Sequence, residues 1–150
     1  SAAKPWGDLY VDNGFFDGNL TVDGNIIHGG TGNGGTYNFS DTVNASSNED
    51  IFSIQCSNGA QAFTVYFTCN MGGMSVAKVY TVVHSYGATV VYNKLVDSGP
   101  YSGEDFTPTF TGATDTVTCN ISNLSTSRNA EIVTTVMLGG SPTALTVTAL

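Results

Sequence analysis

Positive charge is scarce in this sequence. Only four of its 150 residues are Lys or Arg, against twelve Asp or Glu, which gives a formal net charge of -8. All charged residues together make up 11% of the chain, well below the usual share of about a quarter. Proteins that bind nucleic acid neutralise phosphates with clustered Lys and Arg. The composition therefore argues against a nucleic-acid partner and predicts a neutral, polar surface.

Long apolar runs and cysteine are also sparse. No apolar run approaches the length of about 20 residues that a membrane-spanning helix needs, so no membrane insertion is expected. Cys56, Cys69 and Cys119 each lie in an alternating apolar run, and an odd number leaves at least one thiol unpaired. We expect buried free thiols rather than a disulfide. That state suits assembly in a reducing compartment.

A short motif repeats near the start of the sequence. Gly-x-Leu-x-Val-Asp occupies 7–12 and returns at 18–23. A strand of about five residues with one apolar stripe is marginal in water by itself. Three chains wound about one axis would bury that stripe, whereas the alternative is an N-terminal hairpin in a monomer. We predict a trimeric β-shaft, with these residues on its axis: Leu9, Val11, Leu20, Val22 and Ile26.

The chain divides into three parts on this interpretation. Residues 1–28 form the end of the shaft, 29–35 a glycine-rich joint, and 36–150 a head domain. The head alternates apolar and polar residues with period two, and turn signals recur roughly every 8 to 12 residues. The pattern predicts an all-β fold whose head is an antiparallel, jelly-roll-like β-sandwich. The expected head strands are 36–43, 50–56, 61–69, 74–85, 88–96, 105–110, 115–121, 130–138 and 143–150.

Residues suited to catalysis are few. Glycosidic cleavage needs two converging carboxylates, and the adjacent acidic pairs are 49–50 and 104–105. Neighbouring residues on a strand point to opposite faces, so we expect both pairs to be solvated charges. No Gly-x-Ser-x-Gly motif is present. We therefore predict that the chain is not an enzyme and has no catalytic residues.

Metal-binding patterns are equally weak. His28 and His84 are the only histidines, and they do not pair at zinc-site spacing. A three-fold His28 site, or Ca²⁺ held by aspartates at the shaft turns, remains an alternative to an exposed histidine and turn-capping carboxylates. We predict neither a metal nor another cofactor.

The order of the loops suggests where a partner would bind. In an antiparallel sandwich, successive connections alternate between the two ends. The longer connections, 70–73, 98–104 and 122–129, then share one end, which is distal if 36–43 is a first strand leaving the shaft; otherwise the end with Tyr86 is distal. Long loops on a rigid scaffold commonly carry recognition, although these could be merely solubilising turns. The predicted receptor-binding residues are Asn70, Tyr101, Glu104, Asn123 and Arg128.

The stalk motif, the glycine joint and the Thr/Val/Asn-rich head together resemble a known class of protein. The head runs 62–69, 75–80 and 93–97 contribute to the same resemblance. The chain resembles the distal region of a bacteriophage tail fibre or tailspike, of the marine or cyanophage-like type. The resemblance implies a homotrimer assembled in the host cytoplasm, carried on the virion with the rest of its fibre, that attaches to a host-surface glycan or protein.

Two other functions stay open at this stage. The first is a structural virion protein, such as a capsid fibre or decoration protein, with no receptor-binding role. The second is a fragment of a polysaccharide lyase or hydrolase, since some fibre tips cut what they bind.

Overall fold

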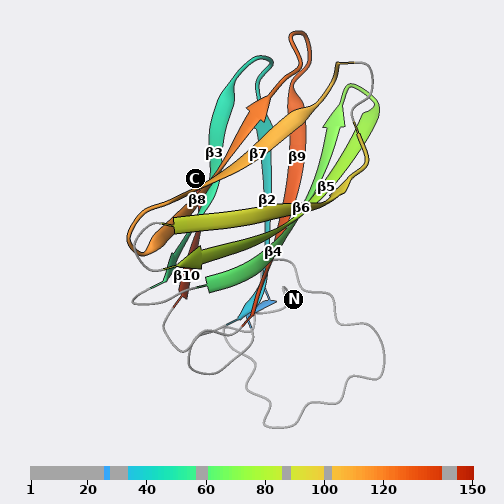
Figure 1. Ribbon diagram of the computed structural model, residues 1–150. Helices are drawn as coiled ribbons and strands as arrows, with labels where there is room; N and C mark the ends of the chain where they lie inside the picture. Colours follow the sequence, from blue (N-terminus) through green and yellow to red (C-terminus); the bar gives the residue numbers. More distant parts are fainter. Residues whose placement is uncertain (1–25, 28–33, 57–60, 86–88, 100–102, 140–144) are drawn as a thin grey trace, which may run out of the picture.

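The computed structural model describes residues 26–27, 34–56, 61–85, 89–99, 103–139 and 145–150. Within these ranges the chain is all-β and contains two antiparallel sheets that pack as a sandwich (Figure 1). The described strands are β1 (Ile26–Ile27), β2 (Gly35–Val43), β3 (Asn48–Cys56), β4 (Gln61–Met71), β5 (Met74–Ser85), β6 (Thr89–Asp97), β7 (Phe106–Gly112), β8 (Thr116–Asn123), β9 (Ala130–Leu138) and β10 (Leu145–Ala149). Each predicted head strand is present, with small shifts at its ends.

The strands are divided between the two sheets in a jelly-roll-like order. Sheet A has the order β1-β2-β9-β4-β5-β6, and sheet B has the order β10-β3-β8-β7. β2 pairs with β9 in sheet A, and β3 pairs with β8 in sheet B. The chain therefore crosses from sheet A to sheet B between β2 and β3, and returns to sheet A between β8 and β9. β4, β5 and β6 instead follow one another in sheet A, which makes that sheet the wider one. The predicted fold class, an all-β antiparallel sandwich, is confirmed.

Side chains of alternate residues form the core between the sheets. On β4 the residues Phe63, Val65 and Phe67 are buried, while the residues between them face outward. The Phe67 ring makes edge contacts with Tyr80 of β5 and Phe106 of β7, at centroid distances of 6.1 and 6.0 Å. Edge-to-face pairs of this kind add to the free energy of burying the rings. Period two in the sequence therefore fixes which face of each sheet is internal.

The first described strand belongs to the sandwich. Ile26 pairs with Thr36 and Ile27 with Gly35, so β1 continues sheet A beyond β2. Gly35, placed in the joint by the sequence pattern, is the first residue of β2. The other predicted axis residues lie outside the described residues, as do 28–33 of the expected shaft end and joint.

The cysteines with described side chains are free and buried. Cys69 is 3% exposed and Cys119 is fully buried, as the alternating pattern predicted. Burial, and then the charges of Asp105 and Glu131, raise the pKa of the Cys69 thiol to about 12. Burial likewise raises the pKa of Cys119 well above its usual value. These thiols pack as small hydrophobic groups. In the described part of the chain no helix is long and apolar enough to cross a membrane.

Candidate functional site

Four connections gather at one end of the sandwich, and we call this region the distal end. They are the β2–β3 loop, the β4–β5 hairpin, the β8–β9 loop, and residues 103–105 before β7. Figure 1 places this end opposite β1, and β2 runs from the β1 side toward it. The described parts of the longer connections share one end, as predicted, and residues 100–102 lie outside the described residues. Residues 36–43 therefore lead from the β1 side toward this end.

Arg128 of the β8–β9 loop ties three of these connections together. Its Nη1 donates hydrogen bonds to the carbonyl oxygens of Met71 and Gly72, at 3.1 and 2.9 Å. Its Nε lies 3.7 Å from Oε1 of Glu104. The hairpin that it contacts turns through Gly72 and Gly73, whose φ angles of 61° and 91° suit glycine in a two-residue turn. Arg128 thus acts as a cross-link between loops, with 41% of its side chain exposed.

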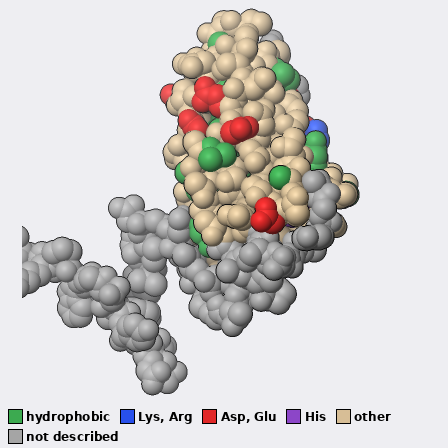
Figure 2. Space-filling view, turned by 90° about the vertical axis from the view of Figure 1, so that its left-hand side faces the viewer, with side chains coloured by type: hydrophobic (Ala, Val, Ile, Leu, Met, Phe, Trp, Pro, Cys, Tyr) green, Lys and Arg blue, Asp and Glu red, His purple; other side chains and the backbone are tan. Residues whose placement is uncertain are grey.

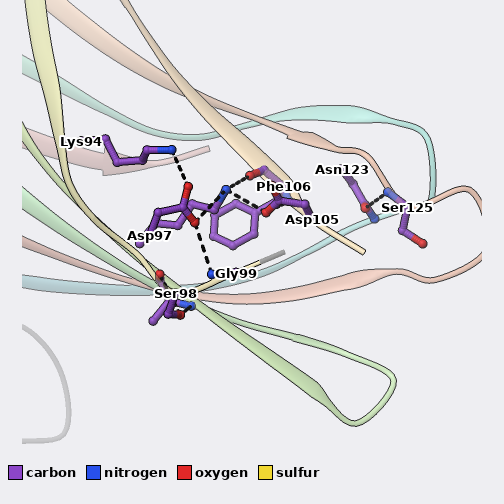
Figure 3. Close-up of polar contacts among 10 residues, drawn as sticks. Lys94, Asp97, Ser98, Gly99, Asp105, Phe106, Asn123 and Ser125 are labelled. Carbon is purple, nitrogen blue, oxygen red and sulfur yellow. Dashed lines mark hydrogen bonds and ion pairs between the residues drawn. The ribbon is translucent and has the colours of Figure 1, made fainter. Parts of the chain in front are cut away.

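Asn123 has a different place from the one predicted. Only 3% of the residue is exposed, so a receptor cannot reach its side chain. Its Nδ2 donates to the carbonyl oxygens of Val43, Asn44 and Arg128, at 2.9, 3.1 and 2.9 Å. Its Oδ1 accepts from the Ser125 amide at 3.0 Å, the contact drawn in Figure 3. Asn123 supports the β2–β3 and β8–β9 loops from beneath.

Asn70 is the predicted site residue whose amide faces solvent. It is exposed at the end of β4, and its Oδ1 accepts a hydrogen bond from the Gly73 amide at 3.0 Å. This bond fixes the orientation of the side chain and leaves Nδ2 as a donor toward solvent. Tyr101 lies outside the described residues. The structure therefore brings Asn70, Glu104, Asn123 and Arg128 to one end, and it divides them between surface and support.

A buried lysine lies just beneath this end, between the two sheets. Lys78 is 3% exposed, and its Nζ lies 2.7 Å from Oδ1 of Asp105 and 3.7 Å from Oδ1 of Asp97. It also donates to the Phe106 carbonyl oxygen at 2.8 Å and lies 5.0 Å from the centre of that ring. Figure 3 shows Asp97, Asp105 and Phe106 of this cluster, with Lys94 beside Asp97. The cluster joins β5 and β6 of sheet A to β7 of sheet B.

The expectation that 104–105 is a pair of solvated charges is wrong. Glu104 and Asp105 are 16% and 18% exposed, and each has a different basic partner, Arg128 and Lys78. As the sequence predicted, the two neighbouring side chains point to opposite faces, which explains why they have different partners. At the edge of the cluster Lys94 hydrogen-bonds Asp97. That bond, together with the Gly99 amide and the charge of Lys78, lowers the pKa of Asp97.

Sequence reasoning missed a hollow on the outer face of sheet A, next to the distal end. It has a volume of about 620 Å³ and crosses β2, β9, β4 and β5. Outward-facing residues of two neighbouring rows contribute to it, because paired strands place them side by side. Asn70 belongs to one row. The first row consists of Thr42, Glu131, Asn70 and Ser75. The second row consists of Ser40, Val133, Thr68 and Ala77.

The described surface is mostly polar and carries little charge, with single apolar side chains such as Val91 and Leu95 exposed on β6. Figure 2 shows one face on which neutral polar groups and backbone dominate and acidic side chains are scattered. The described basic residues are all engaged: Lys78 and Lys94 with carboxylates, and Arg128 with Glu104 and two carbonyl groups. The described surface therefore offers hydroxyl, amide and carboxylate groups to a partner, and its cations are already paired.

The fold belongs to the class of antiparallel, jelly-roll-like β-sandwiches, and one solved structure is similar to it. That structure is the tailspike protein gp49 from Acinetobacter baumannii bacteriophage Fri1, a capsular polysaccharide depolymerase, with a TM-score of 0.55 and 13% sequence identity. The match covers 78% of this chain and 20% of that chain, so this sequence corresponds to about a fifth of the tailspike's length. No family model matches the sequence, and no curated protein is significantly similar to it. At this identity the likeness establishes the fold.

The comparison corrects one prediction from sequence. We expected a chain that is not an enzyme, but the similar protein is a depolymerase. The expectation rested on the lack of a converging carboxylate pair within 150 residues. Carboxylates that converge on a glycosidic bond need not be adjacent in sequence, so a search for adjacent pairs is a poor test for catalysis.

Proposed function

We propose that this chain is a domain of a phage tailspike or tail fibre that attaches the virion to polysaccharide on a bacterial surface. The distal end is the contact region, with Asn70, Glu104, Arg128 and Tyr101 closest to the receptor and Asn123 holding the loops in place. The whole fibre is a homotrimer, joined along the N-terminal segment by Leu9, Val11, Leu20, Val22 and Ile26.

The observation that carries this proposal is the position of the loops. They lie at the end opposite β1, on a rigid sandwich, and internal bonds through Asn123 and Arg128 hold them together. Preorganised loops lose little conformational entropy when they bind. The likeness to part of a tailspike supports the same function.

Binding of the purified chain to host cells tests the proposal. We expect Tyr101→Ala, in the β6–β7 connection, to weaken binding by about tenfold or more, as loss of an aromatic contact does. Tyr86→Ala is the matched control, since the β5–β6 connection lies at the other end of β5 and β6. Equal losses from the two variants, or no binding by the parent chain, would contradict attachment through the distal end.

Sedimentation tests the trimer separately. The chain should sediment as three copies, and Leu20→Asp with Val22→Asp should convert it to a monomer that keeps its β-sheet circular dichroism. A parent chain that sediments as a compact monomer would contradict the trimeric shaft while leaving the fold of the head intact.

A second candidate function is cleavage of the bound polysaccharide, which the depolymerase comparison favours. Release of new reducing ends from purified host capsule by the full-length protein, compared with the 150-residue chain alone, would locate the activity. Release by the chain alone would assign cleavage to it.

A further inference from the structure

We propose that the hollow on the outer face of sheet A is a second glycan-binding subsite, and that it accepts uncharged rather than acidic sugar units. This inference rests on the proposed attachment function and names the class of ligand. Its evidence is the shape of the hollow, the groups that line it and the balance of charge around it.

The shape suits a sugar chain lying across the sheet. A volume of about 620 Å³ falls within the range of roughly 300 to 1,000 Å³ that is usual for ligand sites. Each row crosses four strands, and with strands about 4.8 Å apart it extends roughly 14 Å. The floor consists of paired strands, so the lining groups are held at fixed spacing rather than on loops.

The lining groups are those that recognise sugar hydroxyls. Thr42, Glu131, Asn70 and Ser75 form one exposed row of hydroxyl, carboxylate and amide groups. Asn70 is already oriented, because its Oδ1 is bonded to the Gly73 amide and Nδ2 remains available as a donor. Val133, 48% exposed, provides an apolar centre between Ser40 and Thr68 for the carbon face of a ring.

The charge in and around the hollow explains the choice of ligand. Its outward-facing charged residue is Glu131, which is acidic; Asp41 borders the hollow but belongs to the inward series of β2 with Tyr37 and Val43. Among the described residues the cations Lys78, Lys94 and Arg128 are all paired elsewhere. An acidic sugar would therefore meet the Glu131 carboxylate without a compensating cation, whereas a neutral sugar would donate a hydroxyl to it.

The test compares three oligosaccharides of equal length by titration calorimetry with the full chain: a neutral glucan, an amino-sugar oligomer and a uronic-acid oligomer. We expect saturable binding of the neutral oligomer that changes little between low and high salt, because no ion pair is involved. The uronic-acid oligomer should bind at least about tenfold more weakly. Glu131→Gln should narrow that difference by raising the affinity for the uronic-acid oligomer.

Two matched variants locate the binding. Val133→Arg fills the centre of the hollow, while Met137→Arg adds the same side chain on the same face of β9 but outside it, at nearly equal exposure of 46%. Val133→Arg should abolish binding of the neutral oligomer, and Met137→Arg should leave it within about twofold. Equal effects of the two variants, equal affinity for the acidic and neutral oligomers, or no saturable binding at all would overturn the subsite. Host-cell binding that Tyr101→Ala weakens and Val133→Arg does not would overturn the subsite alone and leave the proposed function standing.

Discussion

The distal end and the outer face of sheet A differ in what their polar side chains do. At the distal end the amide of Asn123 and the guanidinium of Arg128 are engaged in bonds between loops. On the outer face, Thr42, Glu131 and Ser75 are exposed and point away from the sandwich. Polar residues in the loops thus maintain the shape of one region, whereas polar residues on the strands of the other face solvent. The two regions should respond oppositely to substitution.

The largest loss of stability is expected from Asn123→Ala. It leaves three carbonyl groups and one amide without their side-chain partner, beneath loops that shield them from water. Each unsatisfied buried group costs about 1 to 3 kcal/mol, and partial access of water should limit the total to roughly 3 kcal/mol. Urea unfolding followed by circular dichroism measures the change.

The matched control for this prediction is Asn93→Ala on the exposed strand β6. It should change the free energy of unfolding by less than about 0.5 kcal/mol. Equal losses from the two variants would show that Asn123 does not support the distal loops in solution.

Lys78→Met should be the next most costly change. The variant removes a cation that is 3% exposed from Asp105, Asp97 and the Phe106 carbonyl. Breaking a fully buried pair costs about 3 to 5 kcal/mol, but the two carboxylates are 18% and 25% exposed, so we expect roughly 2 kcal/mol. Lys94→Met, whose side chain is 47% exposed, is the control and should cost clearly less. A gain in stability for Lys78→Met would mean that the methionine packs better than the ion pair.

Gly72→Ala should have a smaller effect at the tip of the hairpin. A Cβ at this position would lie 2.7 Å from Nη1 of Arg128, and the backbone has a φ of 61° that disfavours alanine. We expect a loss of about 1 kcal/mol in the free energy of unfolding. Gly139→Ala, where nothing lies within 4 Å, should be nearly neutral. Equal stability of the two variants would show that Arg128 does not need its contact with the hairpin.

Much of this arrangement could be predicted from the sequence, because period two identifies both the strands and their inner faces. The same alternation also indicates which polar residues point inward, although their residue types suggest exposure. Asn123 continues the inward series Val117, Cys119 and Ile121, so alternation alone places it inside. Asn70 follows Cys69, which is inward, and therefore faces out. Loop membership suggested the same role for both residues, whereas alternation distinguishes them.

The partners of the buried charges and the hollow could not be predicted in the same way. Lys78 falls in the inward series with Val76 and Tyr80, which signals burial, but the carboxylates that stabilise it come from β6 and the residue before β7. The hollow depends on the registers of β2, β9, β4 and β5, and three of these strands are distant in sequence. From the sequence alone, without the strand registers, Ser40, Thr68 and Glu131 can be recognised only as solvent-facing positions.

The smallest effect on stability is expected on the outer face of sheet A. Glu131→Gln keeps the size and shape of an exposed side chain whose neighbours in the row are Thr42 and Asn70. It should change the free energy of unfolding by less than about 0.5 kcal/mol, in contrast to Asn123→Ala. Parallel urea titrations of the two variants measure the difference directly. A loss for Glu131→Gln as large as that for Asn123→Ala would mean that the carboxylate stabilises the sheet, and the contrast between the two regions would then fail.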